Sequence, residues 1–303
     1  MLRDAGQRLL MGEKLAVLGS PIAHSKSPLI HAAAYEELGL SWRYTRIRVG
    51  EDGLAPFLDG RGPGWRGFSL TMPLKEEAHR VAAALDPAAM ESGVVNTLLR
   101  LSGPGTPRWA GFNTDVGGLA EAVRKAGLDA TRTAVIGSGA TAVSAILAAR
   151  SLGAEHVSIL ARNIRATSDL VARFADSHEP GSQLRLHVEG TSLRHPEALD
   201  VALHPALEAT LVISTLPGPA GRELELPAAL MRIPLFDVAY DPWPSPLAER
   251  WRAAGGTAHA GIDMLVEQAL LQIRVFANGD PGLPLEAEER VLAAMHRAAG
   301  SRS

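Results

Sequence analysis

Short runs of apolar residues alternate along the chain with longer segments in which apolar residues recur every three or four positions. The short runs are typical of buried strands and the longer segments of amphipathic helices, and their alternation is typical of α/β proteins with largely parallel sheets. In the first part of the chain the pattern predicts a helix over residues 28–38 and strands at residues 15–18, 44–49, 67–71, 94–100 and 109–112, the last two joined by a turn.

The pattern starts again after a helix predicted over residues 115–126. It then predicts strands at 133–136, 156–160, 211–214 and 235–238, an apolar helix ending at 152, a helix at 166–174, a proline-rich loop at 240–246 and final helices at 264–276 and 286–299. A chain of 303 residues is long enough for two domains. We therefore expect a two-lobed α/β protein. One α/β domain would span residues 1–113, completed by C-terminal helices within 256–303, and a Rossmann-like doubly wound domain would span 114–255.

Composition and charge narrow the possible classes of function. Hydrophobic residues make up 46% of the chain and charged residues 21%, which fits a globular protein with a sizeable core. The net charge of −3 gives no general attraction to nucleic acid or to an anionic membrane surface. The absence of cysteine excludes disulfides, thiolate metal sites and a cysteine nucleophile, and the ten histidines show no metal-ligand spacing, so we expect no bound metal.

No stretch has the pattern of a targeting signal or a membrane span. The first 14 residues mix charged with apolar residues and contain no continuous apolar region. The uncharged stretch 133–149 is short for a bilayer and is interrupted by glycines. We therefore expect a cytoplasmic protein that works on a small molecule, without nucleic acid or membrane partners.

A glycine-rich turn follows the predicted strand at 133–136. Gly137, Gly139 and Ala142 form the pattern G-x-G-x-x-A. The first glycine permits a tight turn, the second lets the backbone approach a pyrophosphate, and the small third residue lets helix and strand pack closely. Taken alone, the motif is also compatible with an ordinary strand-to-helix turn, so the next strand of the unit has to be considered as well.

The next predicted strand ends in Arg162, with Asn163 and Arg165 close behind and no acidic residue at the strand end. An NAD-binding unit places Asp or Glu there to hold the ribose 2′-hydroxyl, whereas a guanidinium suits the 2′-phosphate of NADP. The alternative is that Arg162 is an ordinary solvated residue. The arrangement favours NADP as the cofactor.

Hydroxyl groups follow the first predicted strand, at Ser25 and Ser27. Ligands of open α/β sheets bind at the strand ends, and two hydroxyls at alternate positions are suited to grip a polyol or a carboxylate. Ser27 precedes Pro28, so it could instead serve as the N-cap of the following helix. Ser25 has no such structural alternative.

A lysine follows the strand predicted at 67–71. Lys75 would lie in the first turn of a helix, where the helix dipole disfavours a cation and so favours acid–base use of the amine. The alternative is a surface pair with Glu76 or Glu77. Further polar residues occur at Asn96 and Asp115, and Asp115 or its neighbour Thr114 could simply cap a helix. Gln268 and Gln272, four residues apart on an otherwise apolar helix, form one polar line.

Taken together and in this order, the motifs resemble those of the shikimate dehydrogenase family. The resemblance covers nearly the whole chain. It consists of S-x-S at 25–27, T-x-P-x-K-E at 71–76, V-N-T at 95–97, N-T-D at 113–115, the glycine turn at 137, D-V-A-Y at 237–240 and Gly261 followed by M-L-V-E-Q at 264–268. It implies reversible, NADPH-dependent reduction of 3-dehydroshikimate to shikimate in aromatic amino-acid biosynthesis, with the first domain binding substrate and the second binding NADP.

The resemblance also implies roles for individual residues. Lys75 and Asp115 would be the catalytic pair, with Lys75 delivering the proton to the carbonyl oxygen as hydride arrives. The substrate would be held by Ser25, Ser27, Thr71, Asn96 and Gln268, with Tyr240 nearby. The cofactor would contact Gly137, Ser138, Gly139, Ala140 and Thr141 at the pyrophosphate, Arg162, Asn163 and Arg165 at the 2′-phosphate, and Val238 and Gly261 near the nicotinamide.

The chain departs from the family pattern at three places. Ser69 stands where the family usually has Asn, residues 161–163 read A-R-N instead of N-R-T, and residues 213–215 read I-S-T instead of N-A-T. The first two departures concern the preference for substrate or cofactor, not the chemistry. Two other functions stay open: a quinate or quinate/shikimate dehydrogenase with relaxed cofactor use, and a non-catalytic NADP-sensing module. Whether the protein is a monomer or a homodimer is equally open.

Overall fold

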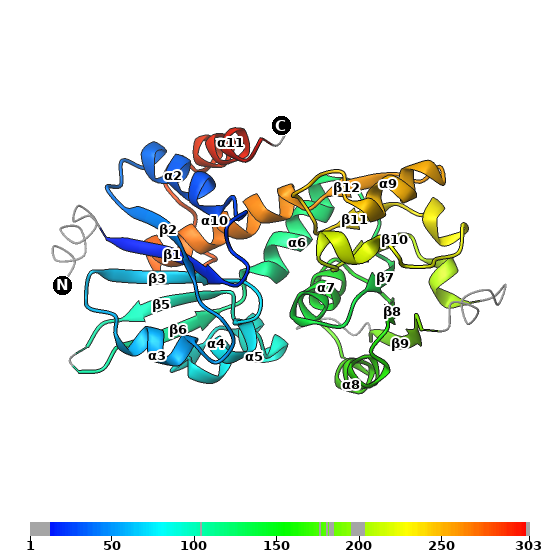
Figure 1. The fold of residues 1–303 in the computed structure, drawn as a ribbon, viewed down its shortest axis with the longest axis horizontal. Helices are drawn as coiled ribbons and strands as arrows, with labels where there is room; N and C mark the ends of the chain where they lie inside the picture. Colours follow the sequence, from blue (N-terminus) through cyan, green and yellow to red (C-terminus); the bar gives the residue numbers. More distant parts are fainter. Residues whose placement is uncertain are drawn as a thin grey trace. The chain divides into compact units, whose positions relative to one another are not determined.

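The computed structural model describes residues 13–103, 105–175, 177–179, 181, 185–194 and 204–300 (Figure 1). The chain folds into two compact units, one made of Met1–Gly118 and Leu265–Ser303, the other of Leu119–Met264. The sequence predicts divisions at 113/114 and 255/256, and these units divide five and nine residues later, inside helices α6 (Thr114–Lys125) and α10 (Ile262–Asn278). Within the described residues, no helix combines the length and apolar character that a bilayer crossing needs.

The first unit is built on a mixed sheet. Its strands are β1 (Lys14–Gly19), β2 (Arg43–Arg48), β3 (Trp65–Leu70), β4 (Ala84–Leu85), β5 (Thr97–Leu101) and β6 (Arg108–Phe112), in the order β2-β1-β3-β5-β6-β4. β1 is parallel to β2 and β3, while β5 is antiparallel to both β3 and β6. The carboxyl ends of β1, β3 and β6 and the amino end of β5 therefore meet at one edge of the sheet.

Helices cover both faces of this sheet (Figure 1). One face carries α3 (Leu54–Asp59), α4 (Lys75–Val81) and α5 (Pro87–Ser92), and their buried residues share an apolar core with the central strands, including Phe68, Leu74 and Trp109. The other face carries α2 (Ser27–Glu37), α10 and α11 (Glu288–Ala299). Each strand residue buried on one face alternates with a neighbour that points to the other, as the period of a strand requires.

The second unit is a doubly wound sheet. Its strands are β7 (Arg132–Ile136), β8 (His156–Ala161), β9 (His187–Ser192), β10 (Leu211–Ser214), β11 (Leu235–Asp237) and β12 (Ala258–Ala260), in the order β12-β11-β10-β7-β8-β9 with parallel neighbours. Numbered along the chain, this is the 3-2-1-4-5-6 order of dinucleotide-binding sheets. The order reverses between β7 and β10, which is where such sheets bind their ligands.

Helices α7 (Ala140–Ser151), α8 (Ile164–Phe174) and α9 (Pro246–Ala253) and the 3₁₀ turns η2 (Pro205–Glu208), η3 (Gly218–Gly221) and η4 (Leu230–Arg232) complete the second unit. The sequence pattern predicts most central strands of both units within a residue or two. It misplaces the start of β5, which begins at Thr97, so Asn96 precedes the strand instead of lying inside it. The two-lobed α/β architecture with a Rossmann-like unit is confirmed.

Candidate active site

A buried lysine–aspartate pair lies at the edge of the first sheet where the strand ends meet. Lys75 is the first residue of α4, after β3, and Asp115 lies in the first turn of α6, after β6. Lys75 Nζ is 2.5 Å from Asp115 Oδ2, and the two side chains are only 12% and 8% exposed. Lys75 therefore does not form the surface pair that was its alternative. The Glu77 carboxylate instead accepts hydrogen bonds from the backbone N–H groups of Leu54 and Ala55 at the start of α3.

Asn96 orients the aspartate. Its Nδ2 donates to Asp115 Oδ1 at 2.8 Å and to Thr114 Oγ1 at 2.9 Å, while its Oδ1 accepts from the Thr114 backbone N–H at 2.9 Å. Both carboxylate oxygens of Asp115 are thus engaged, one by an amide and one by the ammonium group. The pair is held in position before any ligand arrives, which is the arrangement that proton transfer requires.

The local sequence explains why Asp115 is available for this pairing. Asn113 Oδ1 accepts a hydrogen bond from the Asp115 backbone N–H at 3.1 Å, and Asn113 Nδ2 donates to Ser92 Oγ at 2.8 Å. Asn113 therefore supplies the acceptor that a helix start needs. Asp115 does not cap α6 with its own side chain, so its carboxylate can face Lys75.

The serines after β1 are arranged differently from the capping alternative. The N-cap position of α2 is Lys26, without a side-chain hydrogen bond, and Ser27 is already the first helical residue. Ser25 Oγ accepts from the Ser27 backbone N–H at 3.3 Å and donates to Ser27 Oγ at 3.2 Å. From β2, Arg46 Nε donates to the Ser25 carbonyl oxygen at 2.8 Å and so holds this loop. Ser27 is buried, and its hydroxyl does not cap the helix.

Thr71 follows β3 beside the end of β1. A Cβ atom placed on Gly19 would lie 2.4 Å from Thr71 Cγ2 and 2.9 Å from the Met72 carbonyl oxygen. The two strand ends are therefore in direct contact, and only a glycine fits between them. This contact brings the loop that carries Ser25 and the loop that carries Thr71 to the same edge of the sheet.

Gln268 lies on α10 next to Asn96. Its Nε2 donates to the Leu265 carbonyl oxygen at 2.8 Å, and its Oε1 is 3.4 Å from Asn96 Nδ2. Helix α6 approaches this point very closely, because a Cβ atom on Gly118 would be 2.6 Å from the Gln268 backbone nitrogen and 2.5 Å from Gln268 Cβ. The backbone of Gly118 thus sets how deeply Gln268 enters the site.

Gln272, one turn further along α10, belongs to a buried polar cluster behind the pair. Its Oε1 accepts from Ser69 Oγ at 2.7 Å and contacts His31 Nε2 at 3.3 Å, and His31 Nδ1 is 3.0 Å from the Tyr35 hydroxyl. An amide oxygen only accepts, so Nε2 carries the imidazole proton and Nδ1 accepts from Tyr35. Both glutamines of the predicted polar line therefore face polar groups of the first unit.

His31 is fully buried and stacks on Tyr44, with the ring centroids 3.9 Å apart. Burial lowers the pKa of His31 to about 3, against the weaker opposing effect of its hydrogen bond with Gln272. Burial also raises the pKa of Tyr35 and of Tyr44. All three rings therefore stay neutral around neutral pH.

In the second unit, the glycine turn lies where the strand order reverses. Gly137 has a φ of +124°, and a Cβ atom there would be 2.3 Å from Thr215 Oγ1 after β10. Gly139 has an ordinary φ of −92°, and a Cβ atom there would meet nothing within 4 Å. Gly137 is thus required by the fold, whereas Gly139 leaves open space at the start of α7. Ala142 is fully buried, as close packing of the helix on the sheet requires.

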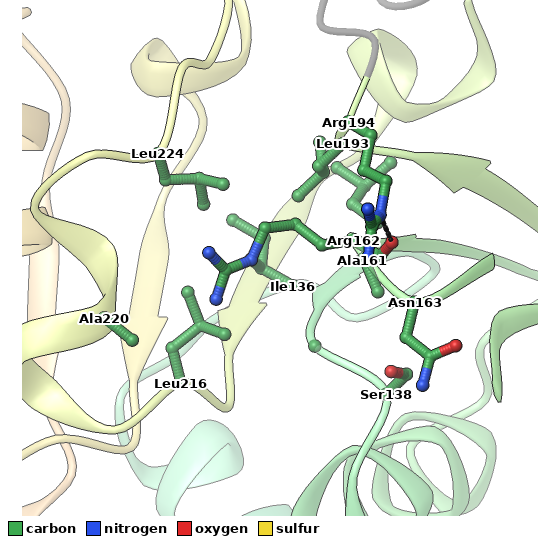
Figure 2. A pocket seen from close by; sticks show the side chains of 12 residues that line it. Ile136, Ser138, Ala161, Arg162, Asn163, Leu193, Arg194, Leu216, Ala220 and Leu224 are labelled. Atoms are coloured by element: carbon green, nitrogen blue, oxygen red, sulfur yellow. Dashed lines mark hydrogen bonds between the residues drawn. The ribbon is translucent and has the colours of Figure 1, made fainter.

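A cavity of about 640 Å³ opens beside this turn (Figure 2). The Arg162 side chain extends from the end of β8 across the cavity towards Leu216, Ala220 and Leu224, and Ser138 and Asn163 lie on the other side. Asn163 caps α8, because its Oδ1 accepts from the Ala166 backbone N–H at 3.2 Å. None of the described residues that line this cavity is Asp or Glu.

The second arginine that reaches this cavity is Arg194, whereas the sequence predicts Arg165. Arg165 is exposed on α8 and does not line it, whereas Arg194, two residues after β9, does. Arg194 Nε donates to the Arg162 carbonyl oxygen at 2.8 Å. The sequence pattern does not indicate Arg194, because it does not predict β9 and so indicates no strand end at this position.

The remaining predicted residues lie at the same edge of the second sheet. Val238 follows β11 and Gly261 follows β12, and a Cβ atom on Gly261 would be 2.0 Å from the Val238 carbonyl oxygen. Tyr240 follows in the loop after β11 and is half-buried. Asp237 anchors this loop, because it accepts a hydrogen bond from Ser245 Oγ at 2.5 Å, and burial raises the pKa of its carboxyl group.

These residues fit a dinucleotide with an extra phosphate. The turn at Gly137 and the open space at Gly139 leave room for a pyrophosphate, and the cavity offers guanidinium groups without an acidic residue in its described lining. In the described part of the chain, no group of three or more His, Asp or Glu side chains is arranged to hold a metal ion.

A sheet of this order with this turn, in a chain that also buries an ammonium–carboxylate pair, defines a dinucleotide-dependent oxidoreductase. The shikimate dehydrogenase (NADP(+)) of Alkalilimnicola ehrlichii is 34% identical to this chain over 86% of its length and 91% of the relative's. The chain belongs to the shikimate dehydrogenase family.

Other comparisons agree. Residues 17–98 match the family model of the shikimate dehydrogenase substrate binding domain. The structure of Mycobacterium tuberculosis shikimate dehydrogenase is similar with a TM-score of 0.76 and 35% identity, over 94% of this chain and 99% of that one. The structure of the Thermus thermophilus enzyme, which is in complex with NADP(H) and shikimate, is similar with a TM-score of 0.74 and 30% identity, over 94% and 99% of the two chains.

Proposed function

We propose that the protein is an NADP-dependent shikimate dehydrogenase that reversibly reduces 3-dehydroshikimate to shikimate. The observation that carries the proposal is the buried Lys75–Asp115 pair, with Nζ and Oδ2 2.5 Å apart, in a chain whose second unit is a doubly wound sheet with a glycine turn. The family membership and the relative that binds NADP(H) and shikimate support the same reaction.

In this proposal the cofactor supplies or accepts hydride at its nicotinamide ring. The Lys75 ammonium group stabilises the negative charge that grows on the substrate oxygen and donates a proton to it, and in the reverse direction the amine takes the proton back. Asp115 orients Lys75 through Oδ2, while Asn96 holds the other carboxylate oxygen. A carboxylate fixed on both sides cannot rotate away, so the lysine keeps its position during the reaction.

The proposal assigns the other residues by their positions. The substrate carboxylate and hydroxyls would contact Ser25, Ser27, Thr71, Asn96 and Gln268, with Tyr240 nearby. The pyrophosphate would lie against the residues of the turn, 137–141. Arg162 and Asn163 would bind the 2′-phosphate, and Val238 and Gly261 would lie on the nicotinamide side. The first unit would thus bind substrate and the second NADP.

Turnover measured with two substrates and two cofactors tests the proposal. Shikimate and quinate are each supplied with NADP and with NAD, and the reduced cofactor is followed by its near-ultraviolet absorbance. We expect the highest kcat/KM for shikimate with NADP. Higher kcat/KM for quinate with NAD would identify a quinate dehydrogenase instead, and cofactor binding without turnover of either substrate would identify a binding module.

We further propose a cytoplasmic enzyme that acts as a monomer or a homodimer. The chain contains no cysteine and so needs no oxidising compartment to fold. Light scattering coupled to size-exclusion chromatography distinguishes the two oligomeric states, and cell fractionation tests the location.

A further inference from the structure

The cavity beside the glycine turn contains a second guanidinium group that the sequence pattern did not indicate. Arg162 enters it from the end of β8 and Arg194 from the segment after β9. Neither guanidinium group has an acidic partner among the described residues, and both side chains are exposed. Two cations that line one cavity, with no carboxylate in its described lining, attract an anion.

Backbone geometry holds Arg194 at this place. β9 pairs with β8 up to the register Ala161↔Ser192, and the Leu193 backbone N–H donates to the Ala161 carbonyl oxygen at 2.9 Å. The next residue, Arg194, then reaches the Arg162 carbonyl oxygen with its Nε at 2.8 Å. This bond uses one guanidinium donor and holds the group beside the end of β8 (Figure 2).

The charges of the described lining residues favour an anion more here than in the adjoining cavity. The cavity shared by Arg162 and Arg194 has no Asp or Glu in its described lining. A neighbouring cavity of about 610 Å³, which the same two arginines also border, is lined in addition by Arg222, Glu223 and Glu225. The two carboxylates there offset positive charge, so of these two cavities the described lining attracts a phosphate more beside Arg162 and the turn.

We propose that Arg194 is a second phosphate-binding residue of the NADP site and that it, rather than Arg165, shares the 2′-phosphate with Arg162. The proposal rests on the function proposed above and deepens it, because it assigns the preference for a 2′-phosphorylated nucleotide to two arginines from neighbouring strand ends. A phosphate monoester carries more than one negative charge and several acceptor oxygens, which one guanidinium group cannot satisfy alone.

Binding of adenine nucleotide fragments to the full-length protein tests this without relying on turnover. Calorimetric titration gives the Kd for 2′,5′-ADP and for 5′-ADP, which differ only in the 2′-phosphate. We expect Arg194→Gln to weaken 2′,5′-ADP about tenfold or more, the effect of losing one charge-assisted hydrogen bond, and 5′-ADP less than about twofold. Arg194→Lys, which keeps the charge, should retain part of the affinity.

Two further variants serve as controls. Arg232→Gln removes the same charge from an exposed position on η4 and should change neither Kd. Arg165→Gln tests the rival residue and should weaken 2′,5′-ADP less than Arg194→Gln does. The same titrations at higher salt should reduce the advantage of 2′,5′-ADP in the wild type more than in Arg194→Gln.

The outcomes separate the possible failures. If the wild type binds both fragments equally, the NADP preference in the proposed function is wrong. If the wild type prefers 2′,5′-ADP but Arg194→Gln leaves that preference intact, or Arg165→Gln removes more of it, the role of Arg194 is wrong. If Arg194→Gln weakens both fragments equally, Arg194 only supports the Arg162 backbone, and the proposal is overturned as well.

Discussion

The two sites treat charge in opposite ways. In the first unit, Lys75 and Asp115 are buried together, and each carboxylate oxygen already has a partner. In the second unit, Arg162 and Arg194 are exposed at a cavity without acidic residues in its described lining. The roles proposed above explain the difference: groups that transfer a proton work best when they are positioned before the ligand arrives, whereas affinity for an anionic cofactor increases when cations are left for the ligand to neutralise.

We expect the largest effect on activity from removing Lys75, and this substitution tests the proposed catalytic pair most directly. We expect Lys75→Ala to lower kcat about 10²–10⁴-fold, the range for lost general acid–base catalysis, and to leave the Kd for NADP near that of the wild type. Stopped-flow or steady-state kinetics together with cofactor titration measure both. Lys125→Ala, at a lysine that pairs with Glu121 on α6, is the matched control and should keep full activity. Undiminished turnover in Lys75→Ala would refute the catalytic role.

The neutral cluster behind the pair predicts a dependence of stability on pH. The pKa of His31 falls from an ordinary value of about 6.5 in the unfolded chain to about 3 in the folded protein. Unfolding therefore takes up a proton between these values. The contribution of His31 is fully present above about pH 6.5 and is lost as the pH falls towards 3, by about 1.4 kcal/mol per pH unit.

Denaturant unfolding of the wild type and of His31→Gln over this pH range checks the expectation. Other titratable groups are the same in both proteins, so the difference between the two free energies of unfolding gives the contribution of His31. We expect the wild type to lose its advantage over the variant as the pH falls. Parallel curves for the two proteins would show that His31 is not held neutral.

Arg162 tests the open site. We expect Arg162→Ala to weaken NADP binding about 10–100-fold, as the loss of charge-assisted hydrogen bonds predicts, and to weaken NAD binding much less. Fluorescence titration with each dinucleotide gives the two Kd values. An equal loss for both cofactors would mean that Arg162 does not contact the 2′-phosphate, and the contrast between the two sites would then disappear.

The smallest expected effects separate the two glycines of the turn. Gly137→Ala places a Cβ atom 2.3 Å from Thr215 Oγ1 at a φ of +124°, so we expect it to lower the free energy of unfolding by about 1–3 kcal/mol. Gly139→Ala meets nothing within 4 Å in the protein and should leave stability nearly unchanged while weakening cofactor binding. Thermal or chemical unfolding with NADP titration distinguishes them, and equal destabilisation would contradict the assignment.

Much of this fold follows from local sequence, because its central strands are continuous apolar runs. β1, β7, β8 and β10 are predicted for that reason. β9 and β12 are missed, because edge strands bury little: β9 contains Glu189 and Gly190, and β12 has only three residues. The short helices α3 and α5 span too few residues to show a periodic pattern.

The site was predictable to a different extent. Motifs single out Lys75 and Asp115, but the hydrogen bond by which Asn96 orients Asp115 depends on the antiparallel pairing of β5 with β6, which brings these two residues together. Local rules also favour Ser27 as the N-cap residue of α2. In the structure Lys26 occupies the N-cap position, and Ser27 is the first helical residue. Arg194 could not be predicted, since its place follows from an edge strand that carries no signal.

Gly118 has no functional group, yet it limits how the proposed substrate site can be altered. Any side chain there would push against the backbone of Gln268 from within 2.6 Å. Alanine scanning normally tests a position by removing side-chain atoms. At Gly118 it would add a methyl group, which would clash with Gln268. Efforts to reshape this enzyme for bulkier acids should therefore begin with the separation of two helices, before any residue that touches the ligand is changed.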